Sequence, residues 1–253
     1  MPDRDELARA LVDLQELAER LRRDCPWDRA QTAETIVPHT VEEAYEVADA
    51  ALAADDAKLV DELGDLLFQT FFLALLIEER GAGDLVAVAG AIHEKLVRRH
   101  PHVFGDGTAD TPGAVKQRWE ELKTEQEGRE GVFHHVPETL PSLLYAQKVQ
   151  RRAGTIGFDY PDLAGASGDL DDEIEELRED PSGTELGDVL FAAVNVARHL
   201  GVDPELELRQ ATGRFVARVE DAERLAAADG HEWEKLPLAE QDRYFDLAKE
   251  AAQ

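Results

Sequence analysis

The chain has 253 residues, enough for one large domain or two smaller ones, and 43% of them are hydrophobic, which suits ordinary globular cores. Its formal net charge of −28 argues against a binding face for a nucleic acid polymer, because phosphate backbones are held by clustered Lys and Arg. A nucleotide is not excluded, provided that a divalent cation and a few basic groups mediate the contact.

Cysteine content and hydropathy indicate where the protein works. Cys25 is the only cysteine, so the chain forms no internal disulfide and suits a reducing compartment. The N-terminal residues are acidic and lack the apolar segment of a signal peptide. The most apolar run, 66–77, is far shorter than the ~20 residues that span a bilayer. We therefore expect a cytoplasmic protein without membrane contact.

Apolar residues recur at helical spacing along most of the chain, and the alternation typical of strands appears nowhere convincingly. The fold class predicted is therefore all-α. Pro38 is expected in the first turn of a helix or just ahead of it, where a missing N–H is tolerated. In the first half of the chain the expected helices cover about 5–23, 58–79, 85–99 and 114–126, together with one that carries Glu43 and Glu46.

Two pairs of carboxylates stand on neighbouring expected helices. Glu43 and Glu46 are three residues apart, as are Glu62 and Asp65, and side chains at that spacing share one face of a helix. The polar Ala-Asp-Asp-Ala stretch between the helices predicts a hairpin that brings the two faces together. Two like charges ~4 Å apart repel by about 1 kcal/mol in water and by more in an enclosed site. Four converging carboxylates are therefore expected to bind a cation.

The same pattern occurs a second time. DELGDLLFQTFFLA at 61–74 returns as TELGDVLFAAVNVA at 184–197, and AIHEKLVRRH at 91–100 is echoed by ATGRFVARVE at 211–220. This predicts an internal duplication, with tandem four- to five-helix bundle units over 1–127 and 139–253 and a linker over 128–138. The second copy places four acidic residues at the positions of the first set: Glu173, Glu176, Glu185 and Asp188.

The second hairpin is shorter than the first. Fifteen residues separate Glu46 from Glu62, but eight separate Glu176 from Glu185. The carboxylates of the second copy are therefore expected close to its turn. We expect the two sites to differ in turnover, with the second one open or weak.

A carboxylate site without His or Cys suits Mg²⁺ or Mn²⁺ better than zinc, which prefers nitrogen and sulfur. Mg²⁺ keeps several waters and typically bridges protein carboxylates to substrate phosphates. The ligands lie on helices and lack EF-hand spacing, and neither copy has the Glu-x-x-His pair of di-iron bundles. A single Glu-x-x-Glu pair is usually only surface, but two pairs in one hairpin, present twice, favour a metal site.

Basic pairs accompany the acidic ones. Lys95 and Arg99 are four residues apart near the end of an expected helix, and Arg214 and Arg218 take their places in the second copy. Such a pair presents one cationic face, which suits triphosphate oxygens. A solvated helix end favoured by the macrodipole is the alternative. Recurrence in both copies favours substrate binding.

Two further residues are candidates for substrate binding. Trp27, matched by Phe158 in the second copy, suits stacking on a nucleobase, although packing in a core or dimer interface is the commoner role of a single aromatic residue. Asn195 stands where the first copy has Phe72. A polar side chain on an otherwise apolar helix needs a partner, which is either a ligand or a buried backbone group.

With these motifs in place, the chain resembles two-domain MazG-type nucleoside triphosphate pyrophosphohydrolases of the all-α NTP pyrophosphatase superfamily. The resemblance covers nearly the whole chain. Its motifs are Pro26-Trp27-Asp28, Glu42-Glu43-x-x-Glu46 with Glu62-x-x-Asp65, Arg99-His100-Pro101-His102-Val103-Phe104, and Glu173-x-x-Glu176 with Glu185-x-x-Asp188. The second copy departs from the pattern at Asp172, where the first has Glu42, and at Thr212-Gly213, where family members often carry Asn and an acidic residue.

The resemblance implies a homodimeric α-helical protein in which the four acidic residues of each copy hold Mg²⁺ and form the catalytic centre. It also implies hydrolysis of NTPs or dNTPs to the monophosphate and pyrophosphate, by water attack at the α-phosphorus, with nucleotide-pool sanitation as the suggested role. One Glu of each site is expected to act as general base.

Two other functions fit the same residues. One is a non-catalytic acidic helical module that holds a cation or the basic face of a partner; the basic pairs argue against it. The other is a pyrophosphatase of narrower specificity, of the dUTP or phosphoribosyl-ATP type. The CPWD and RHPHVF stretches favour the broad MazG type.

Overall fold

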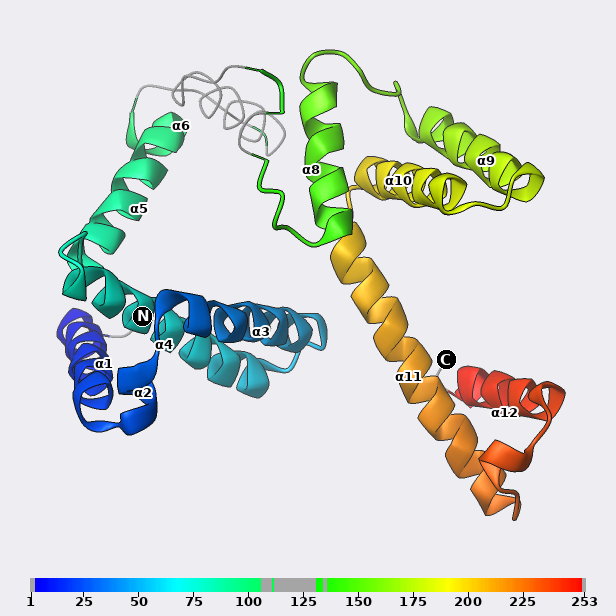
Figure 1. Cartoon of the computed structure of the whole chain (residues 1–253), viewed down its shortest axis with the longest axis horizontal. Coiled ribbons are helices and arrows are strands. Elements are labelled where there is room, and N and C mark those ends of the chain that lie inside the picture. Colours follow the sequence, from blue (N-terminus) through cyan, green and yellow to red (C-terminus); the bar gives the residue numbers. More distant parts are fainter. Residues whose placement is uncertain (1–2, 106–110, 112–130, 134–135, 252–253) are drawn as a thin grey trace. The chain divides into compact units, whose positions relative to one another are not determined.

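The computed structural model describes residues 3–105, 111, 131–133 and 136–251. Every regular element within these residues is a helix, which confirms the all-α prediction. The chain divides into two compact units, Met1–Gly128 and Arg129–Gln253 (Figure 1). The expected helix around 114–126 and part of the expected linker lie outside the described residues. In the described part, no helix combines the length and apolarity needed to cross a membrane.

The first unit is built on a helical hairpin. Its two helices, α3 and α4, lie antiparallel side by side, and α1 packs against α4 (Figure 1). A buried cluster of Ile36, Phe72 and Leu76 joins the two helices of the hairpin. The elements in chain order are α1 (Arg4–Asp24), α2 (Pro26–Ala30), α3 (Ala33–Leu52), α4 (Asp56–Glu79), α5 (Leu85–Arg99) and α6 (Pro101–Phe104).

Pro38 lies inside α3, and its predicted place in the first turn or ahead of it was wrong. The helix begins earlier because Thr32 and Thr35 form a capping box. The Thr32 hydroxyl accepts from the Thr35 N–H (3.4 Å), and the Thr35 hydroxyl accepts from the Thr32 N–H (2.9 Å). Pro38 removes one backbone hydrogen bond in the second turn. The cap and the burial of Ile36 offset that loss.

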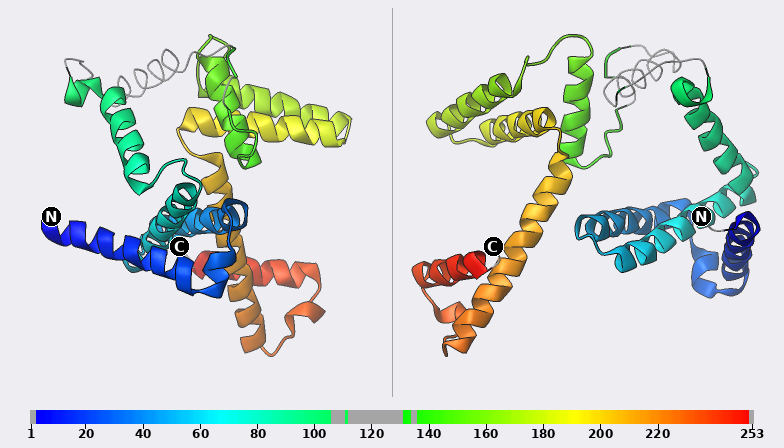
Figure 2. Two further views of the ribbon diagram at one scale, coloured as in Figure 1. Left: turned by 60° about the vertical axis from the view of Figure 1, so that its left-hand side comes forward. Right: turned by 180° about the vertical axis from the view of Figure 1, so that it is seen from behind.

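The second unit repeats the hairpin with α9 and α10, and α8 packs against α10. Beyond the hairpin, α11 carries α12 on a separate cluster of Ala222, Ala226, Tyr244 and Ala248. Figure 2 shows α11 leading away from the α9–α10 hairpin in both of its views. The elements are α8 (Ser142–Gly154), α9 (Leu163–Glu179), α10 (Gly183–Leu200), α11 (Pro204–Ala228), the 3₁₀ helix η1 (Trp233–Lys235) and α12 (Leu238–Ala251).

Candidate active site

The hairpin of the first unit brings its carboxylates together. Glu43 of α3 and Glu62 and Asp65 of α4 each offer a carboxylate oxygen within 4.8 Å of the others. Burial, followed by the charges of Asp65, Glu46 and Glu62, raises the pKa of Glu43 above its ordinary value. Burial and then the charge of Glu46 likewise raise the pKa of Glu62. Glu46 therefore faces the same cluster, although it is outside the closest group of three.

The second hairpin repeats the cluster. Glu173 of α9 and Glu185 and Asp188 of α10 place carboxylate oxygens within 4.8 Å of one another. Burial raises the pKa of Glu173, and the charges of Glu176 and Asp188 raise it further. Glu176 is itself exposed, and its charge is close enough to raise the pKa of Glu173.

The shorter turn changes the surroundings of the second cluster. Glu62 is buried and lies in the second turn of α4, whereas Glu185 is half-buried and lies in the first turn of α10. The Ser182 hydroxyl caps that turn by accepting from the Glu185 N–H at 3.2 Å. The positive end of the helix dipole therefore faces Glu185 and favours a negative charge there. The second cluster is also the more accessible to a ligand.

Both clusters fit a hard divalent cation. Their donors are carboxylate oxygens alone, which Mg²⁺ and Mn²⁺ accept. The raised pKa values of Glu43 and Glu173 are partly the result of mutual repulsion, which a bound cation relieves. Exposed acidic groups are common without a metal, so the strength of this fit lies in the convergence of carboxylates from two helices in each unit.

The basic pairs do not lie on the carboxylate hairpins. Lys95 and Arg99 are on α5, which runs from α4 to α6, away from the α3–α4 hairpin (Figure 2). Arg214 and Arg218 are on α11, which likewise leads away from the α9–α10 hairpin. Within either unit alone, therefore, the structure does not bring the predicted acidic and basic groups together.

A pocket of about 580 Å³ opens beside the second cluster. Glu173 belongs to the carboxylate cluster and also lines this pocket, so the cluster and the pocket adjoin. Much of the remaining wall is aromatic or apolar, and the volume lies in the range of small-molecule sites. The wall also includes Gln150, Phe158, Tyr160, Phe191 and Asn195.

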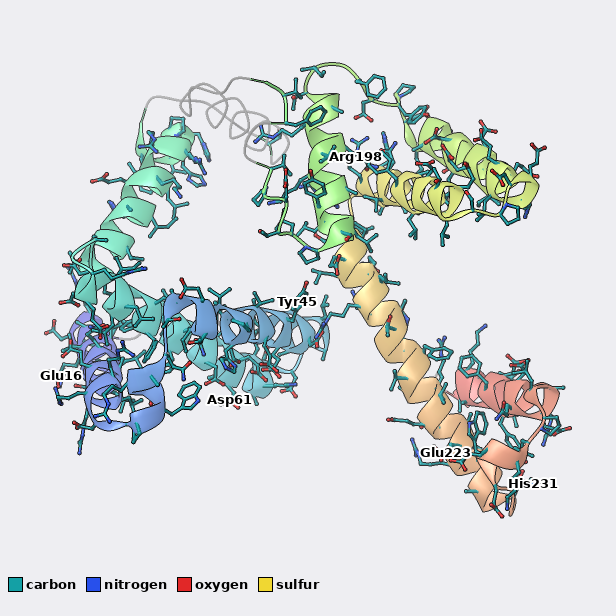
Figure 3. All side chains as sticks on the ribbon, viewed as in Figure 1. Glu16, Tyr45, Asp61, Arg198, Glu223 and His231 are labelled. Carbon is teal, nitrogen blue, oxygen red and sulfur yellow. The ribbon has the colours of Figure 1, made fainter. Side chains whose placement is uncertain are left out.

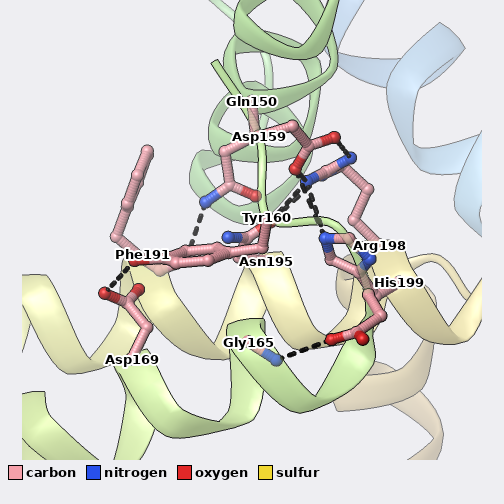
Figure 4. A network of polar contacts seen from close by, with 10 residues as sticks. Gln150, Asp159, Tyr160, Gly165, Asp169, Phe191, Asn195, Arg198 and His199 are labelled. Atoms are coloured by element: carbon pink, nitrogen blue, oxygen red, sulfur yellow. Dashed lines mark hydrogen bonds and ion pairs between the residues drawn. The ribbon is translucent and has the colours of Figure 1, made fainter. Parts of the chain in front are cut away.

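Figure 4 shows a network of polar contacts, and its residues Asp159, Asn195 and Arg198 are among those that line the pocket. Arg198 lies on α10 where this helix meets α8 (Figure 3), and its guanidinium donates to Asp159 at 2.8 Å. The same group donates to the Asn195 Oδ1 at 2.6 Å. The hydrogen bond from Arg198 lowers the pKa of Asp159 below its ordinary value. Asn195 is thus held by Arg198 at the pocket wall, and its partner is a side chain, not a buried backbone group.

The corresponding positions of the first unit are apolar. In the register that aligns Glu62 with Glu185, Phe72 corresponds to Asn195 and Leu76 to His199. Phe72 and Leu76 are buried in the core cluster of the first unit. The two units therefore share a carboxylate cluster and differ in what stands next to it.

Trp27 is exposed on the first unit, with 55% of its surface accessible. Its ring meets that of His39 edge to face at a centroid distance of 6.0 Å. His39 precedes Glu43 by one helical turn on α3. Trp27 therefore stands beside the carboxylate hairpin and outside the core. This position suits stacking on a nucleobase or packing in a dimer interface, but not packing in the core.

Comparison with known proteins assigns the family. Residues 31–104 match the MazG nucleotide pyrophosphohydrolase domain. The chain is 40% identical to the nucleoside triphosphate pyrophosphohydrolase of Escherichia coli K12, over 92% of this chain and 94% of the relative. The chain belongs to the MazG family of nucleotide pyrophosphohydrolases. It is also 39% identical to the MazG nucleoside triphosphate pyrophosphohydrolase/pyrophosphatase of Thermotoga maritima, over 94% of each chain.

Among solved structures, a MazG-related protein from Thermotoga maritima is similar, with 29% identity and a TM-score of 0.39. The match covers 44% of this chain and 97% of that protein.

Sequence reasoning overlooked most of the residues that line the pocket of this MazG chain, among them Gln150, Asp159 and Arg198. One signal was available, because Arg198 interrupts an apolar stretch of α10 and a cation there needs an acidic partner. Gln150 gave no signal, since its α8 neighbour Gln147 has the same side chain but does not line the pocket.

Proposed function

We propose that the protein hydrolyses NTPs and dNTPs to the nucleoside monophosphate and pyrophosphate, by attack of water at the α-phosphorus, with Mg²⁺ or Mn²⁺ as cofactor. The observation that carries this proposal is the position of Glu173, which belongs both to the carboxylate cluster and to the wall of the pocket. A triphosphate held at the cluster would place its nucleoside in the adjoining pocket. The names of the relatives from Escherichia coli and Thermotoga maritima support the same reaction.

The metal would be held by Glu173, Glu176, Glu185 and Asp188 in the second unit, and by Glu43, Glu46, Glu62 and Asp65 in the first. A cation held there would supply neutralisation of charge on the phosphate oxygens and a lowered pKa for a bound water. The carboxylates of the chain would orient the triphosphate through the cation that they hold, and the pocket walls would contact the nucleoside.

The second unit is proposed as the main site of turnover. It combines an accessible cluster with the pocket, whereas the first unit has the buried Phe72 where the pocket wall has Asn195. The shorter hairpin suggested that the second site is open or weak. We propose that it is open and active, because the deletion removes none of its four acidic residues.

A homodimer is proposed to complete the site. Arg214 is exposed on α11, next to Phe215 and Val216, which are 58% and 49% exposed. On α10, Leu186 and Leu190 are 49% and 50% exposed. Packing of a second copy would cover such apolar groups and bring the Arg214 and Arg218 pair of one chain to the carboxylates of the other. The basic pair would then neutralise the departing pyrophosphate.

Pyrophosphate release tests the reaction. The purified chain is incubated with each of the common NTPs and dNTPs, with Mg²⁺, with Mn²⁺, and with a chelator. We expect equal amounts of monophosphate and pyrophosphate in the presence of metal and none with the chelator. Nucleotide binding without any release would favour a non-catalytic acidic module, and release from a single nucleotide would favour an enzyme of narrow specificity.

A further inference from the structure

Gln150 places a buried hydrogen-bond acceptor in the wall of the pocket. Its side chain is 6% exposed, and its Nε2 donates to the Phe191 carbonyl oxygen of α10 at 2.8 Å (Figure 4). Among the described residues, no donor forms a hydrogen bond with its Oε1. Buried acceptors without a partner are rare in folded proteins, because each one gives up its hydrogen bonds to water without replacement.

The Phe191 carbonyl fixes the orientation of the Gln150 amide. Only the NH₂ group can donate to the Phe191 carbonyl, and a reversed amide would bring two oxygens together. Oε1 is therefore held as an acceptor, and it lacks an N–H or O–H donor in a residue that lines the pocket.

The rest of the wall indicates what the donor is. Phe158, Tyr160 and Phe191 offer aromatic surface to a flat ring, and Glu173 connects the pocket to the carboxylate cluster, where a phosphate chain would lie. A nucleobase is flat, carries N–H groups on its edge, and is attached to the phosphates through a sugar. Its exocyclic amino group projects beyond the ring edge, which suits an acceptor as recessed as Gln150.

We propose that Gln150 determines base specificity by accepting a hydrogen bond from the exocyclic amino group of the base. The preference follows from the chemistry of the acceptor: a base without the amino group leaves Oε1 buried and unpaired, whereas adenine, cytosine or guanine satisfies it. This inference rests on the proposed function, because it assigns the nucleoside of the substrate to the pocket.

Calorimetric binding of nucleotide analogues tests the proposal independently of hydrolysis. Non-hydrolysable α,β-methylene triphosphates, with Mg²⁺, are compared in pairs that differ only by the amino group: adenosine with purine riboside, guanosine with inosine, and cytidine with 2-pyrimidinone riboside. For at least one pair we expect the amino member to bind about 10- to 100-fold more tightly. In Gln150→Met the difference in that pair should shrink to about twofold or less.

Gln147→Met is the matched control. Gln147 lies on the same helix, is 1% exposed and donates from Nε2 to the Val202 carbonyl oxygen at 3.0 Å, but it does not line the pocket. The control should keep the preference of the wild type. Equal affinities within every pair in the wild type, failure of all the analogues to bind, or an unchanged preference in Gln150→Met would overturn the proposal, and water would then be the partner of Oε1.

Hydrolysis measured in parallel separates the two proposals. Pyrophosphate release from ATP, GTP or CTP without any effect of the amino group refutes the role of Gln150 alone. A preference for the amino group without release of pyrophosphate refutes the proposed reaction alone. The wild-type comparison requires no variant, so a folding defect in Gln150→Met does not remove the test.

Discussion

Phe72 and Asn195 occupy corresponding positions in the two carboxylate hairpins, yet Phe72 is buried in an apolar cluster and Asn195 lines a pocket. Asn195 is kept there by Arg198, whose guanidinium also binds Asp159. The duplicated chain has thus retained the acidic residues in both units while the residues beside them have diverged. This difference is the structural basis for assigning turnover to the second unit.

Filling the pocket should impair substrate binding without removing the metal site. Asn195→Phe introduces the side chain of the first unit into the pocket wall. We expect KM for NTPs to rise by about tenfold or more, because the pocket loses the room for a nucleoside. The rise in melting temperature caused by Mg²⁺ should persist, since the carboxylates are unchanged. An unaltered KM would show that the nucleoside binds elsewhere.

The ion pair of Arg198 and Asp159 should stabilise the second unit in a pH-dependent way. Their side chains are 13% and 27% exposed, so Asp159→Asn should lower the free energy of unfolding by about 1–3 kcal/mol at neutral pH. The pKa of Asp159 is lowered by Arg198, so its contribution is present above the ordinary aspartate pKa of about 4 and is lost as pH falls through the lower folded-state value.

Denaturant unfolding at several pH values measures this contribution. The difference between wild type and Asp159→Asn should be constant from about pH 5 to 7 and shrink below about pH 4. A difference that grows on acidification would contradict the assigned sign.

Repulsion among the carboxylates should lower the stability of the metal-free protein at neutral pH. Because the pKa of Glu43 is raised, its protonated form contributes stability below the ordinary glutamate pKa of about 4.3, and this contribution is lost as pH rises through the folded-state value. Glu43→Gln should therefore raise the melting temperature of the first unit at neutral pH in a chelator, and weaken its response to Mg²⁺. Calorimetric melting with and without metal checks both effects. A lower melting temperature in the chelator would show that repulsion is not the main effect at Glu43.

Mixed dimers test whether a second copy supplies the basic pair. Glu173→Gln and the double variant Arg214→Ala/Arg218→Ala should each be nearly inactive as homodimers. When the two are mixed and allowed to exchange subunits, up to about a quarter of wild-type activity per chain should return, because half the dimers are mixed and each of these has one intact site. Absence of recovery in mixtures that are shown to contain mixed dimers would mean that each chain uses its own basic pair.

The helices could be predicted because their signals are local. The periodic stripe over 85–99 predicted α5 with its observed ends, and 58–79 agrees with α4 except at its first turn. Pro38 was misplaced because the capping box of Thr32 and Thr35 starts α3 earlier than a rule based on proline alone suggests. Spacing also predicted the convergence of Glu43, Glu62 and Asp65, since hairpin pairing follows from two helices and a short turn.

The pocket could not be predicted because it depends on tertiary packing. Gln147 and Gln150 are alike in sequence, and only the packing of α8 against α10 decides which of them reaches the pocket. For the basic pairs, the sequence pattern was clear but the place of the residues in the fold was not. Lys95 and Arg99 form a regular pattern that suggests closeness to the carboxylates, but the direction of α5 decides where they lie, and it leads away from the hairpin (Figure 2).

The most direct test of the whole account compares two matched variants, Glu43→Gln and Glu173→Gln, in the rate of pyrophosphate release at saturating Mg²⁺ and NTP. Each change removes one carboxylate from the corresponding place in one unit. We predict that Glu173→Gln lowers kcat by on the order of 100-fold, whereas Glu43→Gln retains most of the wild-type rate. Equal losses in the two variants, or a larger loss in Glu43→Gln, would contradict the assignment of turnover to the second unit.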